Sequence, residues 1–262
     1  MNLDLKGRVA IVCGASKGMG FASAKALALH GAKVLMVARD PSALEAAAKA
    51  IATEGGVVEA YAGDVGNPEL GQAAVDRCKA ILGPVDILVN NAGGPHMGSF
   101  QEHDSKAWES AIQCNLLSVV RFCKAVAPDM KSRNWGRIIS ITSTVAKEPS
   151  PAMVLSATTR AGVSAFSKSL AIELAQFNIS VNVICPGGVL TDRLVSLLQV
   201  RADREKRDYK DVLNESLASI PAKRFAEPDE IADVILFLAS ESGGYVNGVS
   251  LSVDGALTKA YN

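Results

Sequence analysis

The sequence shows no excess of charge of either sign. Its 27 basic and 27 acidic side chains give a formal net charge of zero. Nucleic acids and anionic membrane surfaces select proteins with a basic excess or basic runs, so we expect neither as a partner. The most charged stretch, residues 201–211, mixes both signs and is predicted to be a solvated helix face.

Long apolar runs are also missing. None approaches the ~18–20 residues that are needed to cross a bilayer. The first eight residues carry charges where a signal peptide would need an apolar core. These absences predict a cytoplasmic protein with no membrane contact.

The five cysteines are scattered and form no CxxC pair. No group of His, Asp or Glu has the spacing of metal ligands either. An odd number of cysteines without such spacing favours reduced, mostly buried thiols. We therefore expect no metal site.

Short apolar, β-branched runs alternate with helical patterns along all 262 residues. Several runs are apolar throughout, as strands buried on both faces must be. The alternation predicts an α/β fold in three layers, with about seven strands in a doubly wound parallel sheet (a Rossmann fold). Residues 1–262 are expected to form a single dinucleotide-binding domain. The predicted strands cover residues 9–13, 33–37, 57–61, 87–89, 137–141, 180–184 and 249–253.

Two proline positions mark helix starts, at Asp40-Pro41 and at Glu227-Pro228. The one irregular region, about residues 187–224, is long and polar in its middle. In this fold, ligands bind beyond the carboxyl ends of the strands, so an insertion there is expected on the substrate side. It is interpreted as a lid over a substrate, with a plain surface helix pair as the alternative.

A glycine-rich segment, Gly14-Ala15-Ser16-Lys17-Gly18-Met19-Gly20, follows the first strand and opens the first helix. Such glycines let the backbone approach a pyrophosphate that rests on the helix N-terminus. The spacing departs from G-x-G-x-x-G, so an ordinary glycine turn remains the alternative.

The second strand is followed by Arg39, where an NAD enzyme usually has a carboxylate. A guanidinium matches a 2′-phosphate, and Lys17 adds a second positive charge. Asp40, the competing carboxylate, is assigned to the helix cap in front of Pro41. These residues predict NADP(H) rather than NAD(H).

With these motifs in place, the chain resembles the classical short-chain dehydrogenase/reductase family from about Leu5 to Leu257. The closest likeness is to 3-oxoacyl-acyl-carrier-protein reductases. The likeness rests on the glycine segment, on Asn90-Asn91-Ala92-Gly93 after the fourth strand, and on Pro186-Gly187 after the sixth. It implies that the cofactor is held by Gly14, Ser16, Lys17, Gly18, Met19, Gly20, Arg39, Asp64, Val65, Asn91, Ala92, Gly93, Arg160, Pro186, Gly187, Val189 and Thr191.

The resemblance breaks at the proton-transfer pair. In the family, a serine holds the substrate carbonyl, a tyrosine protonates it, and a lysine four residues later tunes the tyrosine. Ser143 and Asn115 match the family's serine and asparagine, but Ser156 stands at the tyrosine position and Arg160 at the lysine position. An aliphatic hydroxyl is a far weaker acid than a phenol, so Ser156 cannot simply inherit the role.

Three functions stay open on the sequence alone. The first is an NADP(H)-dependent oxidoreductase for a carbonyl or alcohol substrate, with Asn115, Ser143, Ser156 and Arg160 as catalytic residues. In this reading, Ser156 or a water beside it passes the proton and Arg160 holds the cofactor ribose. The second is a dinucleotide-binding protein with little redox activity, and the third is a non-redox enzyme such as a lyase or dehydratase.

Replacement acids are sought beside the expected substrate site. The candidates are His96, Lys147 and Glu148, each with a surface charge as its alternative. The family likeness also implies a homotetramer or dimer, with helices around residues 105–131 and 153–177 at the interface.

Overall fold

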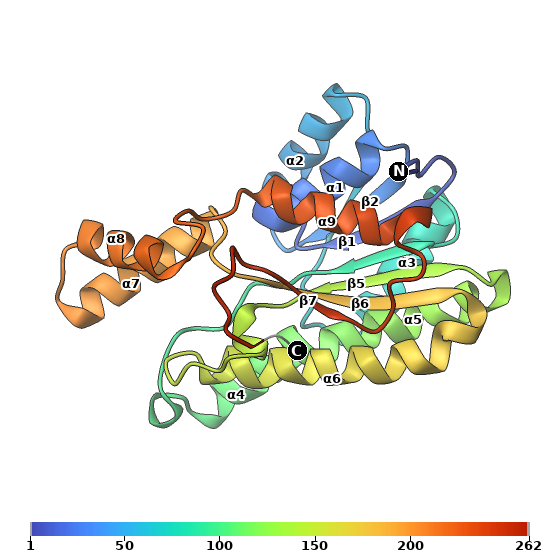
Figure 1. The fold of residues 1–262 in the computed structure, drawn as a ribbon. Helices are drawn as coiled ribbons and strands as arrows, with labels where there is room; N and C mark the ends of the chain where they lie inside the picture. Colours follow the sequence, from blue (N-terminus) through green and yellow to red (C-terminus); the bar gives the residue numbers. More distant parts are fainter. Residues whose placement is uncertain (1, 261–262) are drawn as a thin grey trace.

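The computed structural model describes residues 2–260, and its centre is one parallel sheet of seven strands (Figure 1). The strands follow the spatial order β3-β2-β1-β4-β5-β6-β7. This order reverses direction at β1, as a doubly wound sheet requires. The strands are β1 (Val9–Cys13), β2 (Lys33–Ala38), β3 (Val57–Ala62), β4 (Ile87–Asn90), β5 (Gly136–Ile141), β6 (Ile179–Pro186) and β7 (Ser250–Val253).

All seven predicted strands are confirmed to within two residues at each end. β1, β4, β5 and β6 are buried at every position. This burial on both faces explains why β1 is apolar throughout rather than alternating, whereas β5 and β6 also bury a few polar side chains. Each neighbouring pair is parallel, from Val9 opposite Lys33 in β1–β2 to Pro186 opposite Val253 in β6–β7.

Helices cover both faces of the sheet (Figure 1). On one face lie α1 (Gly18–Leu29), α2 (Pro41–Thr53) and α9 (Pro228–Ala239); on the other lie α3 (Leu70–Ile81), α5 (Ser118–Arg133) and α6 (Val154–Leu174). Each face has its own apolar cluster, the first including Leu27 and Ile235, the second Phe122 and Leu174. The predicted three-layer α/β fold is therefore confirmed.

Both proline-marked helix starts are also confirmed. Asp40 caps α2, its side chain accepting a hydrogen bond from the backbone N–H of Ala43 at 3.1 Å. Glu227 precedes α9 and forms a capping box with Glu230. The carboxylate of Asp40 is thus engaged in helix capping, as the sequence indicated.

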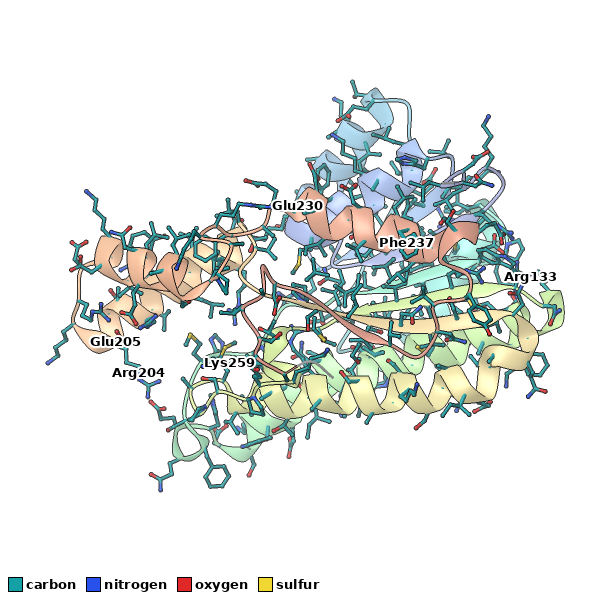
Figure 2. All side chains as sticks on the ribbon, in the orientation of Figure 1. Arg133, Arg204, Glu205, Glu230, Phe237 and Lys259 are labelled. Atoms are coloured by element: carbon teal, nitrogen blue, oxygen red, sulfur yellow. The ribbon has the colours of Figure 1, made fainter. Side chains whose placement is uncertain are left out.

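Residues 187–224 contain two helices, α7 (Asp192–Glu205) and α8 (Tyr209–Ser219), which extend from one end of the molecule (Figure 1). They pack on a small apolar cluster of their own, formed by Leu198, Ala202, Val212, Ile220 and Phe225. The charged stretch on this pair is a solvated surface with internal ion pairs, as predicted; Arg201, for example, binds Glu205 and Glu215. Figure 2 shows Arg204 reaching away from α7; it binds Glu102, which precedes α4 (Ser105–Ile112).

All five cysteines are free, and four of them are buried. Burial raises the pKa of Cys13 and of Cys123 to about 12, so both thiols stay protonated at neutral pH. The prediction of mostly buried thiols is confirmed. Within residues 2–260, no helix combines the length and the apolar character that a bilayer crossing requires.

Candidate active site

A cavity of about 620 Å³ opens at the carboxyl edge of the sheet. Its wall contains residues that follow β1 to β6, together with the first residues of α7. This is the edge at which open parallel sheets bind ligands, and the volume suits a small-molecule site.

The glycine segment forms one part of this wall. Gly14 and Gly18 have φ of +61° and +58°, values that side chains rarely adopt. A Cβ at Gly14 would lie 2.6 Å from Nδ2 of Asn91, so the first turn packs directly on the loop after β4. Lys17, the N-cap of α1, makes no side-chain hydrogen bond to the helix N-terminus, which leaves backbone N–H groups to bind a ligand.

The two cations beside the glycine segment, Arg39 and Lys17, differ in whether a carboxylate pairs with them. Arg39 lies in the cavity wall, and among residues 2–260 it has no ion-pair partner. Lys17, expected as a second cation for a phosphate, instead pairs with Asp192 of α7 at 2.9 Å. Because Asp40 is held by the helix cap, Arg39 is the cation best placed to meet an anion at this end.

Ser143 lies in the cavity wall directly after β5, and its Oγ accepts a hydrogen bond from the N–H of Val145 at 3.4 Å. Asn115 lies deeper, in a π-helical turn (Gln113–Leu117) that joins α4 to α5. Its Nδ2 donates to the carbonyl of Gly93 at 2.8 Å. Such π-helical turns are rare in proteins as a whole, and those that occur often lie at functional sites.

A second, much smaller cavity of about 10 Å³ lies beside Asn115. Its lining includes Asn90, Asn115 and Arg160, and its volume is close to the minimum for one water molecule. Arg160 lines both cavities, so its side chain lies between the small cavity beside Asn115 and the large cavity.

Ser156 and Arg160 bind each other on α6. Nε of Arg160 donates to Oγ of Ser156 at 3.1 Å, and Nη1 donates to the carbonyl of Ile141 at 3.1 Å. Burial, and then the nearby charge of Arg193, lowers the pKa of Arg160 to about 10 from 12.5. The guanidinium therefore remains charged at neutral pH, although no carboxylate within residues 2–260 pairs with it.

Most of the predicted site residues meet in the wall of the large cavity. They are Gly14, Ser16, Lys17, Gly18, Met19, Arg39, Val65, Asn91, Ala92, Gly93, Ser143, Arg160, Pro186, Gly187, Val189 and Thr191.

Four predicted residues lie outside that wall. Gly20 packs α1 against the glycine turn, since a Cβ there would lie 2.1 Å from the carbonyl oxygen of Gly14. Asp64 turns back to accept the N–H of Gly66 at 2.9 Å. Asn115 lines the small cavity, and the hydroxyl of Ser156 is buried against Arg160.

Comparison with known proteins identifies the family of the chain. Residues 8–201 match the family model for short chain dehydrogenases. The chain belongs to the short-chain dehydrogenase family.

Relatives of this short-chain dehydrogenase cover almost its whole length. It is 33% identical to the 2,3-dihydro-2,3-dihydroxybenzoate dehydrogenase of Bacillus subtilis (strain 168), with 97% of each chain covered. It is 34% identical to the 3-oxoacyl-acyl-carrier-protein reductase of Escherichia coli (strain K12), over 97% of this chain and 99% of the relative.

Among solved structures, L-sorbose reductase from Gluconobacter frateurii, in complex with NADPH and L-sorbose, matches with a TM-score of 0.93. It is 34% identical, and the match covers 99% of this chain and 100% of the other.

The structure of this short-chain dehydrogenase also adds residues that the motifs did not reveal. Arg193, Leu194 and Leu197 reach the cavity from α7, and Met153 reaches it from the segment before α6. The polar insertion did indicate this region, but a helix without a binding motif gives no sign of which side chains face a ligand.

The three replacement acids considered from the sequence lie outside the cavity wall. His96 is exposed on the loop after Gly94. Glu148 accepts the backbone N–H groups of Lys259 and Ala260, which fixes the last described residues to the segment after Ser143. Lys147 is partly buried beside it.

Proposed function

We propose that this protein is an NADP(H)-dependent oxidoreductase that interconverts a carbonyl compound and its alcohol. One observation carries the proposal: the glycine segment and Arg39 share one cavity with Ser143 and Arg160. The first pair suits a dinucleotide, and the second offers a hydroxyl and a positive charge to a substrate oxygen.

NADP(H) fits the residues present. The uncapped N-terminus of α1 suits the pyrophosphate, and the glycine turn allows its close approach. Arg39, which has no ion-pair partner among the described residues, suits a 2′-phosphate and favours NADP(H) over NAD(H). The related L-sorbose reductase was solved with NADPH. When bound, NADPH supplies the hydride that the carbonyl carbon gains.

The chain's own residues then orient the substrate and stabilise charge. We assign to Ser143 the hydrogen bond that holds the carbonyl oxygen. The guanidinium of Arg160, fixed to the carbonyl of Ile141 two residues before Ser143, stabilises negative charge that develops on that oxygen. Arg160 also stays our candidate for the contact with the cofactor ribose.

The proton follows a different route from the family's tyrosine. We propose that Ser156 replaces that tyrosine and that Arg160 replaces the lysine. Because the Ser156 hydroxyl is buried against Arg160, its role is to orient the guanidinium. The proton then comes from a water beside Asn115 and Arg160, in the small cavity whose volume is close to the minimum for one water molecule.

The first experiment measures cofactor binding by calorimetry. NADPH is expected to bind at least about tenfold more tightly than NADH, as one charge-assisted contact would give. Arg39→Ala should remove this preference, whereas Arg77→Ala, on the opposite layer's α3, should not. Equal affinities in the unchanged protein would contradict the assignment of Arg39, and no binding of either nucleotide would remove the proposed function.

Turnover is then tested by following NADPH absorbance with ketones, aldehydes and 3-oxoacyl thioesters. Substrate-dependent NADPH oxidation is expected. Tight NADPH binding without turnover on the whole panel would instead favour the dinucleotide-binding protein with little redox activity.

A double substitution tests the proton route. Ser156→Tyr alone places a large ring beside Nε of Arg160 and is expected to disturb the site. Ser156→Tyr with Arg160→Lys removes this conflict and restores the family's pair, so a large gain in activity is expected. A folded double variant that binds NADPH but stays inactive would show that more than the proton donor differs.

Assembly and location remain predictions from the sequence. We infer that the chain forms a dimer or tetramer through the helices α4–α5 and α6, in the cytoplasm. The apolar side chain of Ile172 on α6 is 72% exposed, which supports a contact there. Gel filtration with light scattering tests the oligomeric state.

A further inference from the structure

Six charged side chains line the large cavity: Lys17, Arg39, Asp40, Arg160, Asp192 and Arg193. Both carboxylates are engaged, one in the α2 cap and the other with Lys17. Three guanidiniums are left without a carboxylate partner among residues 2–260, those of Arg39, Arg160 and Arg193. The wall therefore has a surplus of positive charge that the protein itself does not neutralise.

Two of these guanidiniums converge over Gly94. The point where a Cβ would stand on Gly94 lies 3.4 Å from Nη2 of Arg193 and 3.6 Å from Nη2 of Arg160. Arg193 is held there by a hydrogen bond from its Nη2 to the carbonyl of Pro95 at 2.5 Å. Arg160 is held by its Nε and Nη1, which leaves its Nη2 directed toward the same place.

Holding like charges together is unfavourable without an anion. Burial lowers the pKa of both guanidiniums, and the charge of Arg193 lowers the pKa of Arg160 further. An anion between them would relieve the repulsion and replace lost hydration with charge-assisted hydrogen bonds. Gly94 contributes by carrying no side chain in that space.

The phosphates of the cofactor do not account for this pair. Arg39 follows β2, whereas Arg193 follows β6 and Arg160 binds the end of β5. β2 and β6 are four strand positions apart, or about 19 Å at the usual strand spacing. The pyrophosphate belongs at the N-terminus of α1, where Gly18 faces Thr191 and Lys17 pairs with Asp192. The Arg193 side chain instead turns to the carbonyl of Pro95 in the loop after β4.

We propose that Arg193, together with Arg160, binds a carboxylate carried by the substrate. The substrate class is then a keto acid, or a hydroxy acid in the reverse direction. The planar fork of a guanidinium matches the two oxygens of a carboxylate. The reaction named in this inference rests on the proposed function, whereas the binding of the carboxylate does not.

The turnover test compares matched charged and uncharged substrates. The probes are 2-oxopentanoate and 4-oxopentanoate, each beside its methyl ester, with NADPH oxidation as the signal. For the unchanged protein, kcat/KM for at least one acid should exceed that for its ester by about tenfold or more, as one charge-assisted contact gives. Arg193→Gln should bring this ratio close to one, and Arg193→Lys should restore part of it.

Two controls separate this role from cofactor binding and from folding. NADPH affinity should change less than about twofold in Arg193→Gln, because the Arg193 side chain binds the loop after β4 rather than the glycine segment. Arg201→Gln removes a guanidinium from the same helix, outside the cavity wall, and should leave the ratio unchanged. A loss of NADPH affinity in Arg193→Gln that matches the loss of turnover would assign Arg193 to the cofactor and overturn the proposal.

A binding test needs no turnover. Pentanoate and pentanamide are titrated into the protein saturated with NADP⁺, and pentanoate alone should bind, dependent on Arg193. If pentanoate binds in this way while no carbonyl compound is reduced, the proposed function fails and the carboxylate site stands. If pentanoate does not bind and the esters are reduced as well as the acids, the site is refuted and the oxidoreductase stands.

Discussion

Replacing Arg160 by methionine is expected to stabilise the ligand-free protein. The shift of the Arg160 pKa from 12.5 to about 10 corresponds to about 3 kcal/mol against the charged form in the fold. The substitution also removes two hydrogen bonds, to Ser156 and to Ile141, each contributing about 1 kcal/mol. The net gain is therefore about 1 kcal/mol, or a rise of about 2–4 °C in Tm for a chain of this size.

The pH dependence follows from the sign of the shift. The folded-state pKa of Arg160 lies below its unfolded value, so the penalty is fully present below pH 10 and declines only above it. The Tm difference between Arg160→Met and the unchanged protein should thus stay constant between about pH 6 and 9. Thermal unfolding followed by circular dichroism measures it.

The control is Arg201→Met on α7, whose guanidinium lies in solvent beside Glu205 and Glu215. This change should cost at most about 1 kcal/mol, since exposed ion pairs contribute little. If Arg160→Met melted more than about 3 °C below the unchanged protein, the burial argument would be refuted. A gain in Tm together with lost turnover is the pattern of a charge kept for function.

Three further predictions concern the cofactor site, a buried ion pair and the stability at low pH. Gly20→Ala places a methyl group 2.1 Å from the Gly14 carbonyl oxygen, so NADPH affinity measured by calorimetry should fall at least about tenfold; unchanged affinity would contradict the close packing. Asp86→Ala leaves Arg133 without its buried partner and should cost about 3–5 kcal/mol in urea unfolding, whereas a loss below about 1 kcal/mol would refute the pairing. Hydrogen bonds, chiefly from Arg224, lower the pKa of Glu230 to about 2 from 4.5, so its stabilisation is present above pH 4.5 and disappears toward pH 2. The Tm deficit of Glu230→Gln should shrink over that range, and a deficit independent of pH would count against it.

The strands were predictable because a strand that is buried on both faces consists mostly of apolar residues. A strand such as β1 is apolar at every position, and parallel neighbours in the sheet must be joined by crossover segments, here mostly helices. The Asp40 cap was equally local, since the carboxylate and Pro41 are adjacent in the chain. Features that depend on one or two neighbouring residues are therefore visible in the amino-acid sequence alone.

The missed features depend on residues that are far apart in the chain. Arg193 meets Arg160 only because β5 and β6 end side by side, and no spacing in the sequence indicates that contact. The pairing of Lys17 with Asp192 joins the first helix to the seventh.

The separate apolar interior of the α7–α8 pair has an evolutionary consequence. Leu198, Val212 and Phe225 hold the two helices together without using side chains of the clusters that pack on the sheet. Exchanging the side chains that this pair turns toward the cavity would leave both larger clusters intact. Descendants of one ancestor could in this way diverge in the molecules they accept while keeping the same resistance to unfolding.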